Sequence, residues 1–241
     1  MLANDGALTL ICADLDARPL FWTEADRGRH GYEPAVAAAV AGAMGLRLRW
    51  QFRRWAEFVP SLQAGEADAI WCGCAITAER EKSFLFSRPY AIFDEAVLVR
   101  RGAGVRCPSD LRGRRVGAIA GSTNMDLARG WSGCELVGFD GTSDDVFREM
   151  IDALRSRRID AVVDDEPAFG GLSEDPELAI AFVAATGNRW GAAMRPEARD
   201  LKRRLDAAIG TVVDSGELAA IWRAWFPRKA FPPLQGDAIG A

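Results

Sequence analysis

The chain is short of lysine and histidine, and none of its apolar runs is long, although 49% of its 241 residues are hydrophobic. Because no run approaches the ~20 residues of a membrane-spanning helix, the sequence predicts no transmembrane segment. A net charge of −4 without clusters of basic residues argues against nucleic-acid binding. Only three of the 30 basic residues are lysines, so most arginines must be ordinary surface residues. Assigning a function to any one arginine therefore needs a further argument.

The sequence also lacks the clusters of residues that bind metals. His30 is the only histidine, and the Cys72-x-Cys74 spacing has no second matching pair, so we expect no metal and no cofactor. An odd number of cysteines leaves at least one unpaired: Cys12, Cys72, Cys74, Cys107 and Cys134. We expect them to act mainly as small buried apolar side chains, with a Cys107–Cys134 disulfide as the alternative.

The N-terminal segment has none of the features of a signal peptide. Residues 1–6 (MLANDG) contain neither a basic start nor an apolar stretch, and strand-like residues begin by Leu8. Two interpretations stay open on this evidence: a signal peptide has been removed, or the protein stays in the cytosol.

Short apolar strands alternate with amphipathic helices along the chain. The first part predicts strands at 8–13, 46–52 and 68–72, with helices that open near Pro34 and Trp55. This β-α-β-α-β order predicts a largely parallel sheet flanked by helices. The other expected elements are strands at 95–100, 115–119, 135–139, 159–163, 179–183 and 190–194, helices from Thr123 and at 143–155, 196–213 and 216–225, a loop over 14–30 and a tail over 227–241.

The stretch from Trp55 to Tyr90 carries the most specific signal. It runs from an amphipathic helix through a short strand to a tight loop with Thr77 and Arg80, and it ends in an F-S-x-P-Y turn. One guanidinium is thereby placed just past the end of a strand. The planar fork of arginine makes two parallel charge-assisted hydrogen bonds to a carboxylate. Arg80 is therefore our strongest candidate for binding a small carboxylate.

This stretch resembles the bacterial extracellular solute-binding proteins of family 3, which capture polar amino acids for ABC transporters. The family pattern is roughly W-x-x-(L/F)-(I/V)-P-x-L-x-x-G-x-x-D-A-I, then G-x-(S/T)-I-T-x-x-R, then F-S-x-P-Y. The matching residues here are Trp55, Phe58, Val59, Pro60, Leu62, Gly65, Asp68, Ala69, Ile70, Gly73, Ile76, Thr77, Arg80, Phe86, Ser87, Pro89 and Tyr90.

The resemblance implies an α/β, bilobal, periplasmic-binding-protein-like fold of type II, in which two α/β lobes are joined by a two-strand hinge. The first lobe would comprise 1–98 plus 190–241, and the second would comprise 102–186. The crossing strands near 98–101 and 185–190 would form the hinge, and both lobes would close on a ligand in the cleft between them.

The resemblance also implies roles for residues that follow the strands. Arg80 would grip the α-carboxylate of an amino acid, and Thr77 would position that loop or contact the ligand. Gly73 would offer its backbone carbonyl to the ammonium group. Ser122 and Thr123 match the loop by which the second lobe meets the same carboxylate, where hydroxyls and N–H groups at a helix start favour an anion. Thr123 would also cap that helix, since Asp126 three residues on approximates a capping box.

Three further residues match family positions in the cleft. Asp165 corresponds to the acid that binds the ligand ammonium, with Asp164 and Glu166 as close rivals. Trp55 corresponds to the aromatic that covers the ligand, although a place in the core is an equally good interpretation. Asp14, after the first strand, corresponds to an acid that often touches the ligand.

Three positions depart from the family pattern, and one of them is Ala35, where an acid is usual. Ala17 stands where an aromatic residue is usual, and Ala75 stands in the ligand shell where a hydroxyl residue is usual. Both changes weaken the standard amino-acid clamp, and the space at Ala17 favours a larger or non-standard ligand.

The implied function is that of a non-enzymatic receptor. It would bind an amino acid or derivative and deliver it to an ABC transporter permease, as a monomer in the periplasm or another extracytoplasmic space, with its signal peptide removed. One alternative is a cyclohexadienyl-dehydratase-like enzyme with Asp165 or Glu166 as general acid. The other is a sensory or accessory module with an altered site.

Overall fold

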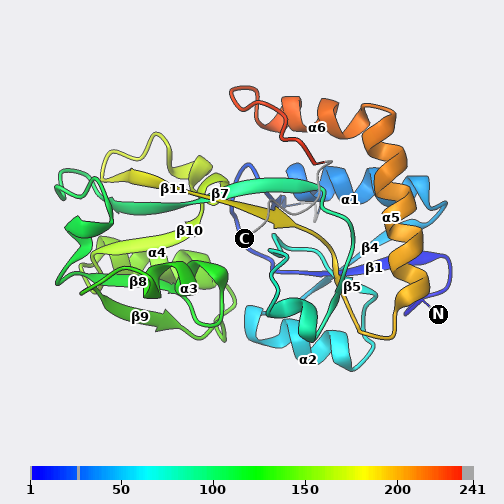
Figure 1. Ribbon diagram of the computed structural model, residues 1–241, viewed down its shortest axis with the longest axis horizontal. Helices are drawn as coiled ribbons and strands as arrows, with labels where there is room; N and C mark the ends of the chain where they lie inside the picture. The colour runs from blue at the N-terminus through cyan, green and yellow to red at the C-terminus, as the bar shows by residue number, and fades with distance from the viewer. Residues whose placement is uncertain (1, 26–27, 235–241) are drawn as a thin grey trace.

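Two five-stranded sheets organise the chain in the computed structural model, which describes residues 2–25 and 28–234. Figure 1 shows the two sheets side by side, each with its own helices, and two long strands that run between them. No helix in these two described stretches is both long and apolar enough to pass through a membrane. The residues of the expected tail beyond 234 lie outside the described part of the chain.

The first sheet has the order β4-β1-β5-β12-β6. Its strands β1, β4 and β5 are parallel, and β12 pairs antiparallel with β5 and β6. Helices α1 and α2 lie on opposite sides of this sheet in Figure 1, and α5 and α6 pack against α1. The bounds are β1 Ala7–Cys12, β4 Arg47–Phe52, β5 Ala69–Ile70, β6 Leu85–Phe86, β12 Ala193–Met194, α1 Tyr32–Ala43, α2 Phe58–Gln63, α5 Arg199–Asp214 and α6 Glu217–Trp225.

The second sheet has the order β11-β7-β10-β8-β9 and carries helices α3 and α4. Parallel pairing joins β10, β8 and β9, whereas β7 and β11 are antiparallel to their neighbours. The bounds are β7 Ala91–Arg100, β8 Arg115–Ile119, β9 Glu135–Phe139, β10 Ala161–Asp165, β11 Leu178–Trp190, α3 Thr123–Arg129 and α4 Val146–Arg155.

Strands β7 and β11 are the two connections between the sheets. Residues 95–99 of β7 pair with β10 inside the second sheet, and residues 91–93 pair with the end of β11 at 188–190. The first crossing therefore precedes Glu95, and the second lies within a register shift between Ala184 and Asn188.

A cluster of aromatic rings fastens these crossing strands to the first lobe. The ring centroid of Phe93 lies 4.7 Å from that of Trp190 and 4.9 Å from that of Trp222 on α6. Both tryptophans are buried. Aromatic pairs at these separations add about 0.5–1.5 kcal/mol each beyond the area they bury. The strands are thus anchored to the first lobe by packing and to the second lobe by strand pairing.

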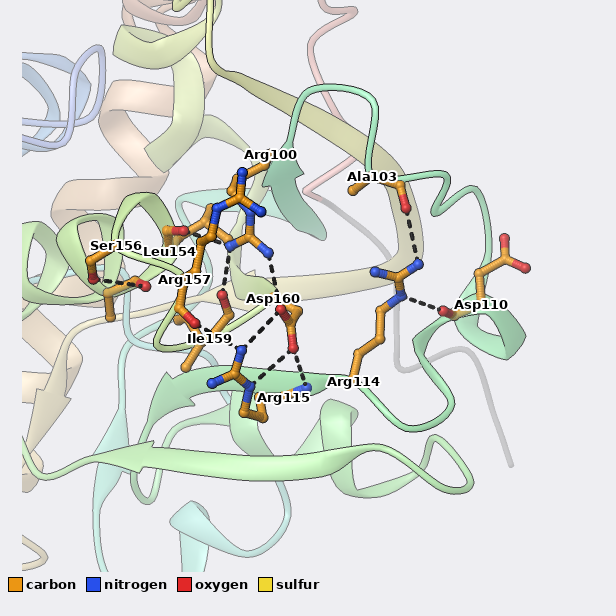
Figure 2. Close-up of polar contacts among 11 residues, drawn as sticks. Arg100, Ala103, Asp110, Arg114, Arg115, Leu154, Ser156, Arg157, Ile159 and Asp160 are labelled. Carbon is orange, nitrogen blue, oxygen red and sulfur yellow. Dashed lines mark hydrogen bonds and ion pairs between the residues drawn. The ribbon is translucent and has the colours of Figure 1, made fainter.

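An ion network closes the far end of the second lobe (Figure 2). The Asp160 carboxylate accepts hydrogen bonds from Arg100 Nη2 at 3.0 Å, from Arg115 Nε at 3.1 Å and from the Arg115 backbone N–H at 3.0 Å. Burial opposes ionisation, but these arginine hydrogen bonds outweigh it and lower the pKa of Asp160 to about 2. The network therefore ties β7 and β8 to the chain that enters β10.

The cysteines agree only in part with expectation. The alternative of a Cys107–Cys134 disulfide is wrong, since all five cysteines are free. The Cys107 sulfur lies 3.0 Å from Ser109 Oγ, and Cys134 donates to the Trp131 carbonyl at 3.4 Å. Cys12 and Cys74 are buried as expected, whereas Cys107 is exposed and Cys72 and Cys134 are half-buried.

A short hairpin replaces part of the loop expected over 14–30. Its strands are β2 (Trp22–Thr23) and β3 (Arg29–His30), which pair antiparallel. Four short 3-10 helices complete the described chain: Trp55–Glu57, Arg80–Lys82, Pro108–Leu111 and Glu166–Leu172.

Candidate functional site

A cavity of about 70 Å³ lies between the two sheets. Six of the nine residues that the sequence predicts for the site line it: Trp55, Gly73, Arg80, Ser122, Thr123 and Asp165. The first three come from the first lobe and the others from the second. Most of the remaining wall is apolar: Ala13, Leu15, Ala17, Leu20, Phe21, Ile119, Val146, Phe147, Ala168 and Trp190. A closed apolar wall with a few polar groups is the usual form of a small-molecule site.

Arg80 is held by the two predicted residues nearest to it in sequence. Its backbone N–H donates to Thr77 Oγ1 at 3.2 Å, and its Nη1 donates to the Ala75 carbonyl at 3.2 Å. Neither Thr77 nor Ala75 lines the cavity. Thr77 therefore holds the backbone of Arg80, and the Ala75 carbonyl holds its guanidinium at the cavity. Ala75 makes this contact through its backbone, so the contact does not need a side-chain hydroxyl.

Gly73 occupies a position that only glycine suits. Its φ of 61° lies in the left-handed region, and a Cβ there would lie 3.2 Å from the Trp190 ring. Its N–H donates to Glu33 Oε2 at 3.2 Å. The loop that follows β5 is thus fixed by a ring on one side and a carboxyl group on the other.

Glu33 supports this loop from within the core and was not recognised in the sequence. It is fully buried, and its Oε2 also lies 3.1 Å from the Tyr90 hydroxyl. Burial raises the pKa of Glu33 to about 8, although the Gly73 N–H opposes the shift. The only signal available in the sequence was one acid in an otherwise apolar first turn of α1.

Three carboxyl groups lie close together on the second-lobe side of the cavity, and two of them line it. Glu95 on β7 and Asp165 on β10 are directly opposite each other in the sheet, and Asp164 precedes Asp165 and also lines the cavity. Burial raises the pKa of Asp164 to about 7. Burial, Asp164 and Glu95 raise the pKa of Asp165 well above its usual range, while Arg80 opposes the shift. Like charges opposite each other repel, so this wall favours a bound cation or shared protons.

Neighbouring side chains hold Glu95 in place. Asn124 Nδ2 donates to Glu95 Oε1 at 3.2 Å, and Thr123 also hydrogen-bonds to this carboxyl group. The third acid of the sequence motif, Glu166, is absent from the cavity wall and instead pairs with Lys229. Glu166 therefore lies away from the cavity, whereas Asp164 and Asp165, the other two candidates for binding the ligand ammonium, line it.

Ser122, rather than Thr123, caps α3. The backbone of Ser122 is extended, and its Oγ accepts from the Met125 N–H at 3.1 Å and donates to the Ile119 carbonyl at 2.7 Å. The expected Thr123–Asp126 capping box is wrong, because Thr123 is already the first helical residue. The hydrogen of the Ser122 hydroxyl is engaged within the protein, whereas Thr123 reaches toward the acids.

Trp55 packs against the second lobe. A Cβ on Gly141 would lie 2.7 Å from the Trp55 ring, and the Ala56 N–H donates to the Gly141 carbonyl at 3.1 Å. Beside them, Arg54 Nε lies 2.7 Å from Asp144. The two lobes are therefore in direct contact at the rim of the cavity.

Asp14 lies apart from the cavity. Its carboxylate accepts from Thr23 Oγ1 at 2.6 Å and lies 3.7 Å from Arg29 Nη1. It lines a separate hollow of about 470 Å³ together with Phe52, Arg53, Arg54, Glu57 and Asp144. Across the described residues, no group of three or more histidine, cysteine, aspartate or glutamate side chains is placed to hold a metal.

Comparison with known proteins agrees with this architecture. The sequence profile of the bacterial extracellular solute-binding proteins, family 3, matches residues 10–228. A probable histidine-binding protein of Neisseria gonorrhoeae is 26% identical over 94% of this chain and 86% of its own length. An L-cystine-binding protein of Escherichia coli K12 is 29% identical over 86% of this chain and 79% of its own.

Solved structures show the same fold. An ancestral arginine-binding protein bound to glutamine superposes with a TM-score of 0.83 at 26% identity, over 92% of this chain and 99% of that one. An amino acid ABC transporter substrate-binding protein from Streptococcus pneumoniae, bound to L-arginine, gives a TM-score of 0.79 at 27% identity over 92% and 95%.

These relatives are binding proteins rather than enzymes, which agrees with the receptor expected from the sequence. The two sheets joined by β7 and β11 form the bilobal type II periplasmic-binding-protein fold that the sequence predicted. The chain belongs to the bacterial extracellular solute-binding proteins, family 3.

Proposed function

We propose that this protein binds an amino acid or a close derivative in the cavity between its lobes and delivers it to an ABC transporter permease. The observation that carries the proposal is the placement of Arg80 on one lobe and Asp165 on the other, both on the wall of one cavity. A zwitterion offers a carboxylate to the first and an ammonium to the second. We propose further that the protein acts as a monomer outside the cytoplasmic membrane, in keeping with its extracellular family.

The carboxylate end of the ligand would rest on Arg80. Among the residues that the structure describes, the guanidinium has one hydrogen bond, from Nη1 to the Ala75 carbonyl, so its remaining N–H groups are available. An arginine that is fixed before binding loses little side-chain freedom when a carboxylate arrives.

The ammonium end would rest on the acidic wall. Asp165 supplies the charge, and the carbonyl of Gly73 supplies a neutral acceptor from the other lobe. A buried carboxylate is stable only when a cation or a proton accompanies it. Ligand binding therefore replaces a bound proton with an ammonium group, and pairs both charges of the ligand out of water.

The excess of acids favours a ligand with a second positive group. Asp164 and Asp165 line the cavity, Glu95 lies opposite Asp165 in the sheet, and Arg80 is the one arginine on the described cavity wall. The ammonium group of an amino acid with a neutral side chain pairs with one carboxyl group and leaves two without a cation. A basic amino acid supplies a second cation through its side chain. The relatives named for histidine and bound to L-arginine fit this preference, and the one named for cystine fits it less well.

A thermal-shift screen tests the proposal. The probes are the twenty standard L-amino acids with ornithine, cystine and citrulline, where citrulline is the uncharged counterpart of arginine. A ligand at one hundred times its dissociation constant adds about 2.7 kcal/mol of stability. We expect a basic amino acid to give the largest shift and citrulline to give much less.

The matched variants are Arg80→Ala and Arg106→Ala, since Arg106 is an exposed arginine outside the cavity wall. The shift should vanish in Arg80→Ala and persist in Arg106→Ala. A screen in which no amino acid raises the midpoint would refute the proposed function, and an equal shift with citrulline would refute only the preference for a second cation.

A further inference from the structure

Backbone hydrogen bonds attach the loop that follows β5 to the crossing strand β11. The Ile76 N–H donates to the Arg189 carbonyl at 2.8 Å, and the Gly191 N–H donates to the Cys74 carbonyl at 3.0 Å. Arg189 and Gly191 flank Trp190, which is the last residue of β11. The loop that would contact the ligand is therefore fastened to the first-lobe end of a strand that joins the two lobes.

Tyr90 lies at the corresponding end of the other crossing strand. It closes the F-S-x-P-Y turn and immediately precedes β7. Its N–H donates to the Trp190 carbonyl at 3.0 Å, and its ring stacks on that of Trp71 with the centroids 4.3 Å apart. Because Tyr90 is fully buried and held by both contacts, its hydroxyl group has a fixed position.

This hydroxyl group and the Gly73 N–H meet on one oxygen of Glu33. Glu33 Oε2 accepts from the Tyr90 hydroxyl at 3.1 Å and from the Gly73 N–H at 3.2 Å. Its other oxygen, Oε1, is buried and has no hydrogen-bond partner among the residues that the structure describes. The direction of the carboxyl group therefore depends on these two hydrogen bonds. Trp190 lies against both Gly73 and Tyr90 and so closes a ring of contacts.

The ring of contacts restrains a residue whose backbone is otherwise free to turn. Gly73 has a φ of 61° and no side chain to hold it, so the direction of its carbonyl depends on what holds its N–H. Neither Glu33 nor Tyr90 lines the cavity, and both act through Gly73, which does. We propose that Glu33 and Tyr90 are positioning residues for the ligand: they direct the Gly73 carbonyl toward the ligand ammonium and tie it to the crossing strands. This inference rests on the proposed function and adds two residues to it.

The role of Glu33 requires an accepting oxygen and no negative charge. Burial raises the pKa of Glu33 to about 8, so the group is mostly protonated at neutral pH. Both of its hydrogen bonds come from donors, and both end on the same oxygen. We therefore expect the amide of glutamine to replace it and the side chain of methionine, which is similar in size, to fail.

Calorimetric titration at pH 7 tests the inference with two pairs of probes. L-arginine is compared with 5-guanidinopentanoic acid, and L-histidine with 3-(imidazol-4-yl)propanoic acid; the second compound of each pair lacks the α-ammonium group. The wild type should bind the amino acid at least about 100-fold more tightly than its counterpart. Tyr90→Phe keeps the stacked ring and removes the hydroxyl. It should lower the affinity for the amino acid about tenfold and leave that for the counterpart within about twofold.

Three further variants complete the experiment. Tyr32→Phe is the matched control, since it removes a buried hydroxyl that donates to the Tyr90 carbonyl and not to Glu33, and it should leave the ratio of affinities unchanged. Glu33→Gln should keep the wild-type ratio, and Glu33→Met should reproduce the effect of Tyr90→Phe. If Glu33→Met does not fold, the other variants still decide the question.

The outcomes separate this inference from the proposed function. If Tyr90→Phe lowers the affinities for both compounds of a pair equally, or lowers neither, the positioning role is wrong and the proposed function stands. The same holds if Glu33→Gln loses the preference for the amino acid. Absence of binding of all four compounds to the wild type would overturn both the proposed preference for a basic ligand and this inference.

Discussion

At the scale of single residues, the cavity is governed by carboxyl groups that the protein keeps away from water. Glu33 accepts a hydrogen bond from the Gly73 N–H, Asp164 and Asp165 line one side of the cavity, and Glu95 lies opposite Asp165 in the sheet. Burial raises the pKa of each carboxyl group, so their protonation depends both on pH and on the binding of a cation.

The pKa of Glu33 gives a prediction about stability. A carboxyl group whose pKa rises from 4.5 to about 8 on folding holds a proton that the unfolded chain releases. The free energy of unfolding contributed by Glu33 therefore falls as pH rises from 4.5 to 8, by at most about 1.4 kcal/mol per pH unit. Glu33→Gln should gain stability relative to the wild type across this window, in urea unfolding measured at successive pH values. Glu81→Gln, at an exposed position, is the control, and parallel curves for Glu33→Gln and the wild type would contradict the prediction.

The pKa of Asp164 gives a prediction about binding. Since this pKa is about 7 in the structure, a cationic ligand must displace a proton at lower pH. The affinity should therefore rise between pH 6 and pH 8, with the Asp164 proton contributing up to about tenfold per pH unit. Titration calorimetry in buffers of different ionisation enthalpy should record proton release. In Asp164→Asn the pH dependence should become shallower, and an unchanged slope would exclude this role.

At the scale of helices and strands, the second lobe depends on the network around Asp160. The pKa of Asp160 is about 2 in the folded protein and lies below that of the unfolded chain. Its contribution to the free energy of unfolding is therefore present above pH 3.8 and is lost as pH falls toward 2. Asp160→Asn should cost about 2 kcal/mol at pH 7 and much less near pH 2. Chemical denaturation at both pH values measures this. A deficit that is independent of pH would indicate that lost packing, and not the ion network, is responsible.

The same scale shows how far sequence patterns can predict structure. The apolar runs of β1 and β8 were recognisable because a buried strand excludes most polar residues, and β4 was recognisable from its alternation of apolar and polar residues. Strands β7 and β11 extend beyond their predicted ends. Residues 91–94 and 184–190 show little alternation of apolar and polar side chains, and pairing between 91–93 and 188–190 holds them as strands. The cap of α3 depends on which hydroxyl residue has the extended backbone, and that cannot be read from two adjacent hydroxyl residues.

Some residues around the cavity could be predicted from the sequence and others could not, because only some of them depend on the order of the elements alone. Arg80 follows β5 and Asp165 is the last residue of β10, so the order of elements alone brings both to the cleft. Glu95 and Glu33 became visible only in three dimensions, since one depends on strand register and the other on packing beneath a loop. Asp14 follows a strand as well, but its bonds to Thr23 and Arg29 direct it away from the cavity.

At the scale of the whole molecule, the contact between Trp55 and Gly141 bears on closure. We expect Gly141→Ala to prevent full approach of the lobes, because the new Cβ would lie 2.7 Å from the Trp55 ring. Overpacking of this kind costs about 1–3 kcal/mol, which corresponds to roughly five- to 150-fold in affinity. Gly102→Ala is the matched control, since its φ of 78° is similar and nothing lies within 4 Å of its Cβ position. Both variants should lose similar stability without ligand, and only Gly141→Ala should lose affinity. Equal affinity in the two variants would contradict a closure that requires this contact.

The central claim is that Arg80 binds the carboxylate of an amino acid between the lobes. Isothermal titration calorimetry tests it most directly, with the amino acid that gives the largest thermal shift and with the amine formed by its decarboxylation. The claim predicts that the wild type binds the amino acid but binds the amine at least about 100-fold more weakly, and that Arg80→Gln removes this difference. Equal affinity of the wild type for the two compounds, or an undiminished preference in Arg80→Gln, would contradict it.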